Sequence, residues 1–405
     1  MKISYPKLTE LELKNKRVFI RVDFNVPLKQ AGDSYEVADP RRIEEALPTI
    51  RFVMEQGGKV ILGSHLGRPK GQPNPKYSLE PVGSYLSRVL GKDVLLTEDC
   101  VGDAPRGLSH QMRAGDVMLL ENLRFHPGEE ENSPEFVNRL AELCDVYISD
   151  AFGTLHRAHA STEGLPKIIK NRAIGFLVEK ELKFLAPLKD HPKRPFLLLM
   201  GGSKVSDKIG VLEYFLPKVD TVVIGGAMAY SFLAAKGFQV GKSLCEEKQV
   251  QLAKKIIRGA DARTVRLILP EDHVVSLAFG DTQNVSITSG IDIPDDKLGL
   301  DIGPKTVAKI ATALETAETI FWNGPMGVFE EPAFAKGTFE VAKLLAQTKA
   351  VKLVGGGDSA AAIMKAGLEA SFDFISTGGG ATLEYLEGKT LPGLKVLERI
   401  EREQG

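Results

Sequence analysis

Residues 351–365 read VKLVGGGDSAAAIMK, and this stretch decides the fold class. A short apolar run of β-strand character ends in three glycines, and a helical segment begins directly after them. Comparable runs occur at 59–63 (KVILG), 145–152 (DVYISDAF) and 196–200 (FLLLM), with long helical stretches between them. This alternation predicts an α/β fold in which parallel strands are joined by crossover helices.

The loops after these apolar runs differ between the two halves of the chain. In the first half they carry cationic side chains, as in SHLGRP (64–69), ENLRFH (121–126) and GTLHRAH (153–159). In the second half they carry glycines, as in GGSK (201–204) and STGGG (376–380). In the first kind of loop, cationic side chains can bind an anion. In the second kind, backbone N–H groups can bind it. Because parallel sheets bind ligands at the carboxyl ends of their strands, we expect two chemically different anion sites.

Composition limits the class of protein. A chain of 405 residues exceeds one ordinary core, and two α/β domains fit best. The 52 lysines and arginines nearly equal the 53 acidic residues, so nothing global indicates nucleic acid or an anionic membrane as partner. The cysteines Cys100, Cys144 and Cys245 lack the spacing of a zinc or redox motif and exclude a disulfide framework. Without an apolar signal segment or a bilayer-length apolar run, we expect a cytoplasmic protein.

The domain organisation follows from the change in loop type. We expect a first domain at 1–172, to which the chain returns at about 390–405, and a second domain at 173–389. A helix at about 175–186 has charged flanks and bridges the domains, and the prolines from Pro187 onward are expected to stop it. This helix and the glycine segment 376–380 are the candidate hinges.

Two segments resemble nucleotide-binding motifs. The run Gly237–Ser243 has three residues between its glycines where a Walker A loop has four, and it follows a helical segment, so it is rejected. The run Gly355–Ala360 follows a strand, opens a helix and has Asp373 roughly 20 residues onward, which keeps a nicotinamide-dependent dehydrogenase as a rival. A two-lobed solute-binding protein is a second rival, although its usual export signal is missing.

Several polar residues have both a structural and a functional interpretation. Asp358 could cap the following helix or hold a metal that bridges phosphates. Lys204 and Lys208, four residues apart, would share a helix face, where lysine beside the positive end is disfavoured unless an anion compensates. Asp23 and Asn25 could form an Asx turn or hold substrate hydroxyls. Arg42 could simply pair with Glu44 or Glu45 on its own helix.

The cationic loops and one apolar loop complete the candidate sites. His65, Arg68, Arg124 and Arg157 each follow an apolar run, and such a cluster repels itself unless an anion joins it. The histidines His126, His156 and His159 are equally consistent with structural roles. The loop Trp322–Glu330 offers apolar surface and one carboxylate, which suits adenine and ribose or simply a turn around a packed tryptophan.

Taken together and in this order, RVDFNVP, SHLGRP, LLENLRF, DAFGTLHRAH, GGSKVSDK, WNGPMGVFE and GGGDS resemble the phosphoglycerate kinase family over essentially the whole chain. The resemblance implies two Rossmann-like parallel-sheet domains facing across a hinged cleft. It implies 3-phosphoglycerate or 1,3-bisphosphoglycerate on the first domain and ADP or ATP with Mg²⁺ on the second. A monomer with small-molecule partners is expected.

The resemblance also assigns residues, motif by motif. It implies that the glycerate substrate binds Asp23, Phe24, Asn25, Arg42, His65, Leu66, Gly67, Arg68, Arg124 and Arg157. It implies that the nucleotide binds Lys204, Lys208, Gly225, Gly226, Gly299, Leu300, Asn323, Pro325, Val328, Glu330, Gly356, Gly357, Asp358 and Ser359. Asp358 is the implied Mg²⁺ ligand, and Arg42, Lys204 and Gly357 are the implied catalytic residues. The implied reaction moves a phosphoryl group between a carboxylate oxygen and the terminal oxygen of ADP. Both acceptors are already anionic, so no general base is required, and alignment and charge stabilisation suffice.

Overall fold

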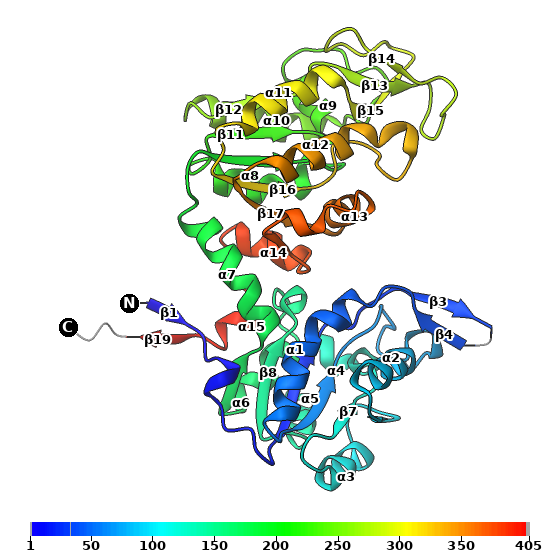
Figure 1. The fold of residues 1–405 in the computed structure, drawn as a ribbon, viewed down its shortest axis with the longest axis vertical. Helices are drawn as coiled ribbons and strands as arrows, with labels where there is room; N and C mark the ends of the chain where they lie inside the picture. The colour runs from blue at the N-terminus through cyan, green and yellow to red at the C-terminus, as the bar shows by residue number, and fades with distance from the viewer. Residues whose placement is uncertain (1, 33, 402–405) are drawn as a thin grey trace. The chain divides into compact units, whose positions relative to one another are not determined.

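The computed structural model describes residues 2–32 and 34–401, and the chain divides into two compact units (Figure 1). Unit 1 comprises residues 1–183 and 390–405, and unit 2 comprises residues 184–389. The helix α7 (Phe176–Asp190) carries the chain from the first unit into the second. Residues 402–405 of the expected carboxyl-terminal return lie outside the described residues.

Unit 1 is built on a six-stranded parallel sheet in the order β6-β7-β5-β2-β8-β9. Its strands are β2 (Arg17–Val22), β5 (Lys59–Gly63), β6 (Val94–Leu96), β7 (Val117–Leu119), β8 (Val146–Asp150) and β9 (Asn171–Ile174). The helices of this unit are α1 (Arg41–Glu55), α2 (Glu80–Leu90), α3 (Asp103–Gln111), α4 (Pro127–Glu130), α5 (Pro134–Ala141), α6 (Leu165–Ile168) and α15 (Pro392–Lys395). Every residue of β8 is buried, as is typical of a parallel strand covered on both faces.

Two small antiparallel pairs complete unit 1. The strands β3 (Leu28–Ala31) and β4 (Ser34–Val37) form a hairpin. The strand β1 (Lys2–Ser4) pairs with β19 (Arg399–Glu401), so two segments far apart in the sequence lie side by side (Figure 1). The chain therefore returns to the first unit at its end.

Unit 2 repeats the architecture with a six-stranded parallel sheet in the order β12-β11-β10-β16-β17-β18. Its strands are β10 (Phe196–Met200), β11 (Thr221–Ile224), β12 (Arg266–Ile268), β16 (Thr319–Asn323), β17 (Val351–Gly355) and β18 (Phe374–Ile375). A second, antiparallel sheet contains β13 (His273–Ser276), β14 (Ser286–Ile287) and β15 (Leu298–Ile302). The expected α/β class with two parallel sheets is confirmed.

The helices of unit 2 alternate with its strands as expected, except that two helices lie in succession between β11 and β12. They are α8 (Ile209–Phe215), α9 (Met228–Ala235), α10 (Glu247–Asp261), α11 (Pro304–Leu314), α12 (Lys336–Gln347), α13 (Gly357–Lys365) and α14 (Gly380–Leu386). The core of the unit includes Trp322 and Ile320 from the central strand together with Val341 and Leu345 from α12.

The expected end of the bridging helix was wrong. α7 continues through Pro187 to Asp190, and the amide of His191 still donates to the carbonyl of Pro187 at 2.9 Å. A proline inside a helix removes one backbone donor and crowds the carbonyl four residues earlier, and α7 accommodates this cost and continues for another three residues. Proline therefore did not mark this helix end.

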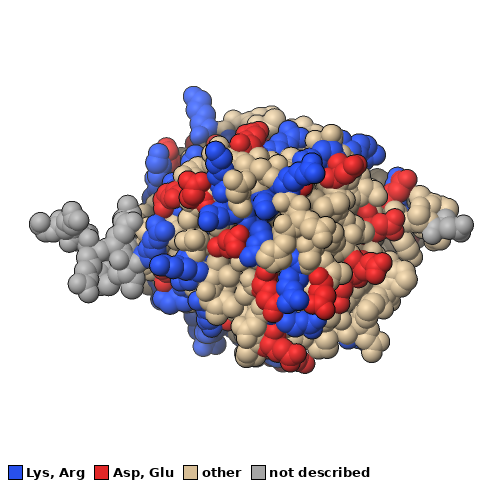
Figure 2. All heavy atoms as spheres, turned by 90° about the horizontal axis from the view of Figure 1, so that it is seen from below, with Lys and Arg blue, Asp and Glu red and all other residues tan. Residues whose placement is uncertain are grey.

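Two surface properties bear on the class of protein. Within residues 2–32 and 34–401, no helix combines the length and the apolar composition that crossing a bilayer requires. On the face drawn in Figure 2, lysines and arginines lie interspersed with aspartates and glutamates. The near balance of charge in the sequence is thus visible as mixed signs on that face.

Candidate functional site

The cationic loops of unit 1 gather at one edge of its sheet. Asp23 follows β2, His65 follows β5, Arg124 follows β7 and Arg157 follows β8. These four strands are parallel, so their carboxyl ends meet at the same edge.

His65 lies at the centre of this cluster. The side chain is buried, and its pKa is held well below the ordinary value, first by burial and then by the positive charges of Arg21, Arg124, Arg157 and Arg42. Burial disfavours a charged imidazole, and four nearby guanidinium groups disfavour it further. His65 is therefore neutral at neutral pH, in a pocket whose charge the arginines supply.

Asp23, Asn25 and Arg42 form a hydrogen-bonded set beside the cluster. Arg42 Nη1 donates to Asp23 Oδ2 at 2.9 Å, and Asn25 Oδ1 accepts from the amide of Gly67 at 2.9 Å. The Asx turn is also present, because the amide of Asn25 donates to Asp23 Oδ1 at 3.2 Å. The alternative pairing of Arg42 with its helix neighbours is wrong, since its carboxylate partner belongs to the β2 loop.

Arg124 is the most deeply buried of the expected arginines. Its exposed fraction is 4%, and Nη1 donates to the carbonyl of Gly67 at 2.9 Å. Burial lowers the pKa of Arg124 to about 10, and the charge of Glu130 opposes this shift. Glu130 Oε1 already lies 3.2 Å from Arg124 Nε, but this one half-exposed carboxylate does not balance the several guanidinium groups gathered here, so the cluster still favours a further anion.

The other expected substrate residues have different positions. Arg157 is half-buried, and its Nε donates to His156 Nε2 at 3.3 Å, whereas Arg68 is exposed. The side chains of Phe24 and Leu66 belong to the hydrophobic core of unit 1. Their side chains are therefore not available to a ligand, and the backbone groups of Phe24 are already paired, its amide with Ser64 Oγ at 2.9 Å and its carbonyl with the amide of Val26 at 2.8 Å.

Sequence reasoning missed Arg21. This residue lies inside β2 with an exposed fraction of 1%, and its Nε donates to Ser161 Oγ at 2.7 Å. Its Nη2 lies 3.3 Å from His65 Nδ1, so it belongs to the cluster. Ser161 also links this arginine to Glu129, which is fully buried and accepts a hydrogen bond from the amide of Ser161 at 3.0 Å. The signal was an arginine within the otherwise apolar run VFIRV, where a charge is expensive to bury.

His159 gives the cluster a measurable pH dependence. Burial, followed by the charges of Arg124, Arg21 and Arg157, lowers its pKa to about 4. Between about pH 4 and the ordinary value of 6.5, the unfolded chain is protonated at this position and the folded protein is not. His159 therefore contributes stability that is complete above pH 6.5 and is lost as the pH falls toward 4.

We expect His159→Asn to flatten this dependence, because asparagine carries no titrating proton. The difference in unfolding free energy between wild type and variant should change by about 1 kcal/mol between pH about 7.5 and about 5, after discounting for solvent screening. Urea unfolding at both pH values measures it. The buried carboxyls Asp150 and Asp301, whose pKa values are raised to about 7, act in the opposite direction but are present in both proteins. A constant difference at both pH values would contradict the assignment.

In unit 2 the glycine loops are tied to one another through their backbones. The amide of Gly201 donates to the carbonyl of Asn323 at 2.9 Å, and the amide of Gly226 donates to the carbonyl of Met326 at 2.9 Å. A Cβ at Gly201 would overlap the carbonyl of Pro325, and one at Gly226 would overlap the backbone of Gly202. Only glycine allows these loops to approach so closely.

Lys208 is held at this edge by Asn323. Its Nζ donates to Asn323 Oδ1, while Asn323 Nδ2 donates to the carbonyl of Gly355 at 2.7 Å. Burial lowers the pKa of Lys208, and the negative charges of Asp207 and Asp358 oppose that shift. The ammonium therefore lies close to the start of α13.

Two expectations about local structure at this edge were wrong. Lys204 and Lys208 do not share the face of a regular helix, because a 3₁₀ turn at Val205–Asp207 separates them and α8 starts only at Ile209. Asp358 does not precede its helix: α13 begins at Gly357 with Gly356 as the N-cap residue. The carboxylate of Asp358 is exposed in the first turn of α13. Lys204, in the loop after β10, is also exposed.

The other residues expected to bind the nucleotide lie in the loops around β11, β15 and β16 and at the start of α13. The amide of Val328 donates to the carbonyl of Leu300 at 2.8 Å, so the loop after β16 joins β15 beside Gly299. Gly225 packs against Met326, next to Pro325. Glu330 is exposed, and Ser359 Oγ already accepts from the amide of Gly324 at 2.6 Å.

Comparison with known proteins was made for the whole chain. The sequence profile of the family described as phosphoglycerate kinase matches residues 8–389. The chain belongs to the phosphoglycerate kinase family. It is 53% identical over 390 residues to the phosphoglycerate kinase of Anaeromyxobacter sp. (strain Fw109-5), covering 96% of this chain and 98% of that protein. It is 48% identical over 388 residues to that of Bdellovibrio bacteriovorus, covering 96% of each chain.

Solved structures of phosphoglycerate kinases have a similar fold. The structure of phosphoglycerate kinase from Coxiella burnetii superposes with a TM-score of 0.87 at 40% identity, covering 97% of this chain and 99% of that one. That from Pyrococcus horikoshii OT3 gives 0.84 at 34% identity, covering 97% and 98%. Membership of the phosphoglycerate kinase family makes this chain an enzyme of the phosphotransferase class.

Proposed function

We propose that this chain catalyses reversible phosphoryl transfer between 1,3-bisphosphoglycerate and Mg-ADP, giving 3-phosphoglycerate and Mg-ATP in glycolysis. Family membership together with two anion sites of different chemistry, one in each unit, carries the proposal. A dehydrogenase would leave the arginine cluster of unit 1 unexplained. A solute-binding protein needs one anion site and not two.

The arginine cluster of unit 1 is proposed to bind the phosphoglycerate. Arg124 and Arg157 offer planar forks that suit phosphate oxygens, and the neutral imidazole of His65 can donate a hydrogen bond without adding to the repulsion. Arg42 is held by Asp23 at 2.9 Å and is proposed to reach the reacting carboxyl end.

The glycine edge of unit 2 is proposed to bind the nucleotide. The amino-terminal turn of α13 begins at Gly357 and presents backbone N–H groups, and the partly buried Lys208 adds a cation beside it. The half-buried Val328 supplies apolar surface for a base, and Leu300 packs against it in the core. Glu330 supplies an exposed carboxylate for ribose hydroxyls.

Asp358 fits the role of Mg²⁺ ligand. Its carboxylate is exposed at the same helix start, and carboxylate oxygen is the donor that Mg²⁺ takes from proteins alongside phosphate oxygens. Held there, Mg²⁺ would supply positive charge that stabilises the charge developing on the phosphates during transfer. Asp358 would hold the ion, and Lys208 would bind phosphate oxygens directly.

Catalysis is proposed to need no general base. Both acceptors, a carboxylate and the terminal oxygen of ADP, are anionic at neutral pH, so no proton has to be removed before transfer. Alignment and charge stabilisation remain, for which Lys204, Arg42 and the amide groups at Gly357 are the proposed groups.

Hinge closure is proposed to bring the substrates into line. The chain passes between units inside α7 and again between Lys389 and Thr390, and closure would exclude water from the acyl phosphate. The segment 376–380 lies before the second crossing. Within it Gly379 has φ +55° at the start of α14, a conformation that favours glycine with or without a hinge.

We expect closure to be visible in solution. The radius of gyration from small-angle X-ray scattering should fall when 3-phosphoglycerate and a non-hydrolysable Mg-ATP analogue are present together, and change little with either alone. The same data test whether the protein is a monomer, as we propose. Unchanged scattering with both ligands would count against hinge closure.

The decisive experiment for the function is hydroxamate formation from 3-phosphoglycerate, Mg-ATP and hydroxylamine by the purified protein. Hydroxylamine traps the acyl phosphate, so product requires phosphoryl transfer to the carboxyl group. Folded protein that forms no hydroxamate would overturn the kinase proposal. Protection against heat by NADH, and not by Mg-ADP, would then favour the dehydrogenase.

A further inference from the structure

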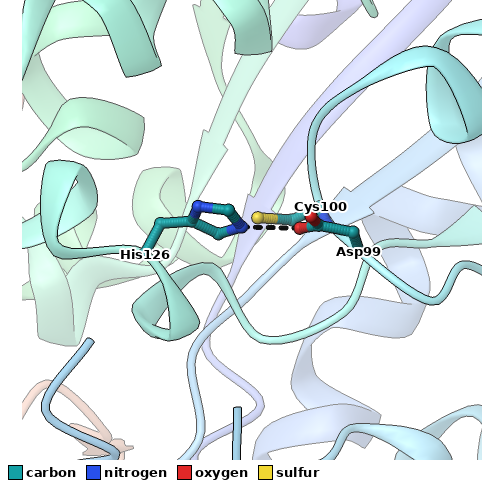
Figure 3. Close-up of side chains that lie close together, drawn as sticks. All are labelled: Asp99, Cys100 and His126. Atoms are coloured by element: carbon teal, nitrogen blue, oxygen red, sulfur yellow. Dashed lines mark hydrogen bonds and ion pairs between the residues drawn. The ribbon is translucent and has the colours of Figure 1, made fainter. Parts of the chain in front are cut away.

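Three side chains with different metal-binding atoms converge in unit 1, outside the sites described above. Asp99 and Cys100 lie between β6 and α3, and His126 caps the amino terminus of α4 (Figure 3). One carboxylate oxygen, the thiol sulfur and one ring nitrogen all lie within 4.8 Å of one another. Figure 3 shows the imidazole facing the other two side chains.

We propose that Asp99, Cys100 and His126 form a binding site for a zinc-class divalent cation, with water as a further ligand. Thiolate, imidazole and carboxylate are the three ligand types that Zn²⁺ takes in proteins, and Co²⁺ shares them. A hard ion such as Mg²⁺ prefers oxygen ligands, so this site and the proposed nucleotide-bound Mg²⁺ call for different metals.

The burial of the three residues suits entry of an ion from solvent. Cys100 has an exposed fraction of 1%, while the side chains of Asp99 and His126 are 48% and 28% exposed. The ion would meet the imidazole and the carboxylate first and the sulfur below them. The ring of His126 stacks on Phe136 with centroids 5.3 Å apart, and this contact fixes the plane of the ligand.

The geometry needs only a small adjustment. His126 Nε2 and Asp99 Oδ1 are 2.6 Å apart as hydrogen-bonded partners. Two such ligands on a tetrahedral zinc ion are separated by roughly 3.3 Å, so the pair must open by less than about 1 Å. Binding leaves His126 as a neutral imidazole that coordinates through Nε2, and it displaces the thiol proton of Cys100, which passes to solvent.

Two observations oppose metal binding at this site. Burial raises the pKa of the Cys100 thiol well above its ordinary value, and the charge of Asp99 adds to the effect. The amide of Cys100 also donates to Asp99 Oδ1 at 2.6 Å, which occupies part of the carboxylate. Without metal binding, His126 and Asp99 are hydrogen-bonded to each other beside a protonated, inert thiol.

Cobalt provides the direct test, because a thiolate ligand gives Co²⁺ an intense near-ultraviolet charge-transfer band and a tetrahedral shell gives strong visible bands. We expect the wild-type protein, titrated with CoCl₂ without nucleotide, to develop both, and ZnCl₂ to abolish them. Cys100→Ser should lose the charge-transfer band. Cys144→Ser is the matched control, since Cys144 is also a buried free cysteine of unit 1, and should keep it.

A second variant keeps the test decisive if Cys100→Ser fails to fold. His126→Gln changes a more exposed side chain and should weaken Co²⁺ binding at least about tenfold. No band in the wild type, a band that survives in Cys100→Ser, or unchanged affinity in His126→Gln would overturn the proposal. Both readouts are independent of catalytic activity, so they stand or fall apart from the kinase proposal.

Discussion

Replacing Lys204 with alanine is expected to lower kcat by about 10²–10³-fold and to leave the KM for Mg-ATP nearly unchanged. Lys204 is exposed at the loop that follows β10, whereas Lys208 is partly buried and held by Asn323. An exposed, mobile ammonium can follow the transferring group, and a cation that acts mainly in the transition state affects kcat more than binding. Steady-state kinetics of hydroxamate formation measures both constants.

Lys242→Ala is the matched control for this experiment. Lys242 is an exposed lysine of the same unit, in the segment rejected as a Walker A loop, where its amide donates to the carbonyl of Lys297 at 2.7 Å. Removing its side chain should not affect kcat. If Lys204→Ala raised KM and left kcat intact, Lys204 would be a binding residue and the assignment to the transferring group would be wrong.

Arg124→Met is expected to raise the KM for 3-phosphoglycerate by about 10²-fold, with little change in the KM for the nucleotide. A bidentate guanidinium contributes roughly 1.5 to 3 kcal/mol per charge-assisted bond to an anion, and methionine fills similar space without charge. Arg113→Met, on an exposed arginine of the same unit, is the control and should bind substrate normally.

The same substitution should not destabilise the ligand-free protein. Burial and the charges of Arg157 and Arg21 lower the pKa of Arg124, so its charged form costs free energy in the folded state at every pH below about 10. Removing that charge should leave the melting temperature unchanged or higher, while inorganic phosphate should stabilise the variant less than the wild type. A large loss of stability without ligand would mean that Arg124 is chiefly structural.

Much of the fold followed from simple patterns in the sequence. Apolar runs such as KVILG and FLLLM became buried parallel strands, because a strand covered on both faces needs apolar residues on both. The loops after them had to meet at one edge of each sheet. His65 and Arg124 could thus be placed near each other from the sequence alone, although nearly sixty residues separate them.

The local geometry of the sites could not be predicted in the same way. Whether Asp358 precedes a helix or lies in its first turn depends on where Gly356 places its positive φ of 90°. Arg42 could have paired within its helix, and only the tertiary fold brings the carboxylate of Asp23 to it. Arg21 stayed hidden because its neighbours in β2 read as core.

The direction in which a side chain points could not be predicted from the sequence either. Phe24 and Leu66 stand in motifs expected to bind substrate, yet both side chains enter the core, because the direction of a side chain in a loop depends on the local backbone conformation, which residue spacing does not reveal. Likewise, nothing in the sequence joins His126 to Cys100, which come from separate loops.

The glycine contacts of unit 2 bear on how this enzyme can be re-engineered. At Gly201, Gly226 and Gly324 the obstacle to any side chain is neighbouring backbone, which cannot swing aside as a flexible side chain can. Libraries that randomise these positions should therefore return almost only the parental residue. Altered nucleotide preference is better sought at Val328 and Glu330, whose side chains are half-buried and exposed. In unit 1, where side chains are proposed to bind the substrate, single substitutions at many more positions should change the preference for the acceptor.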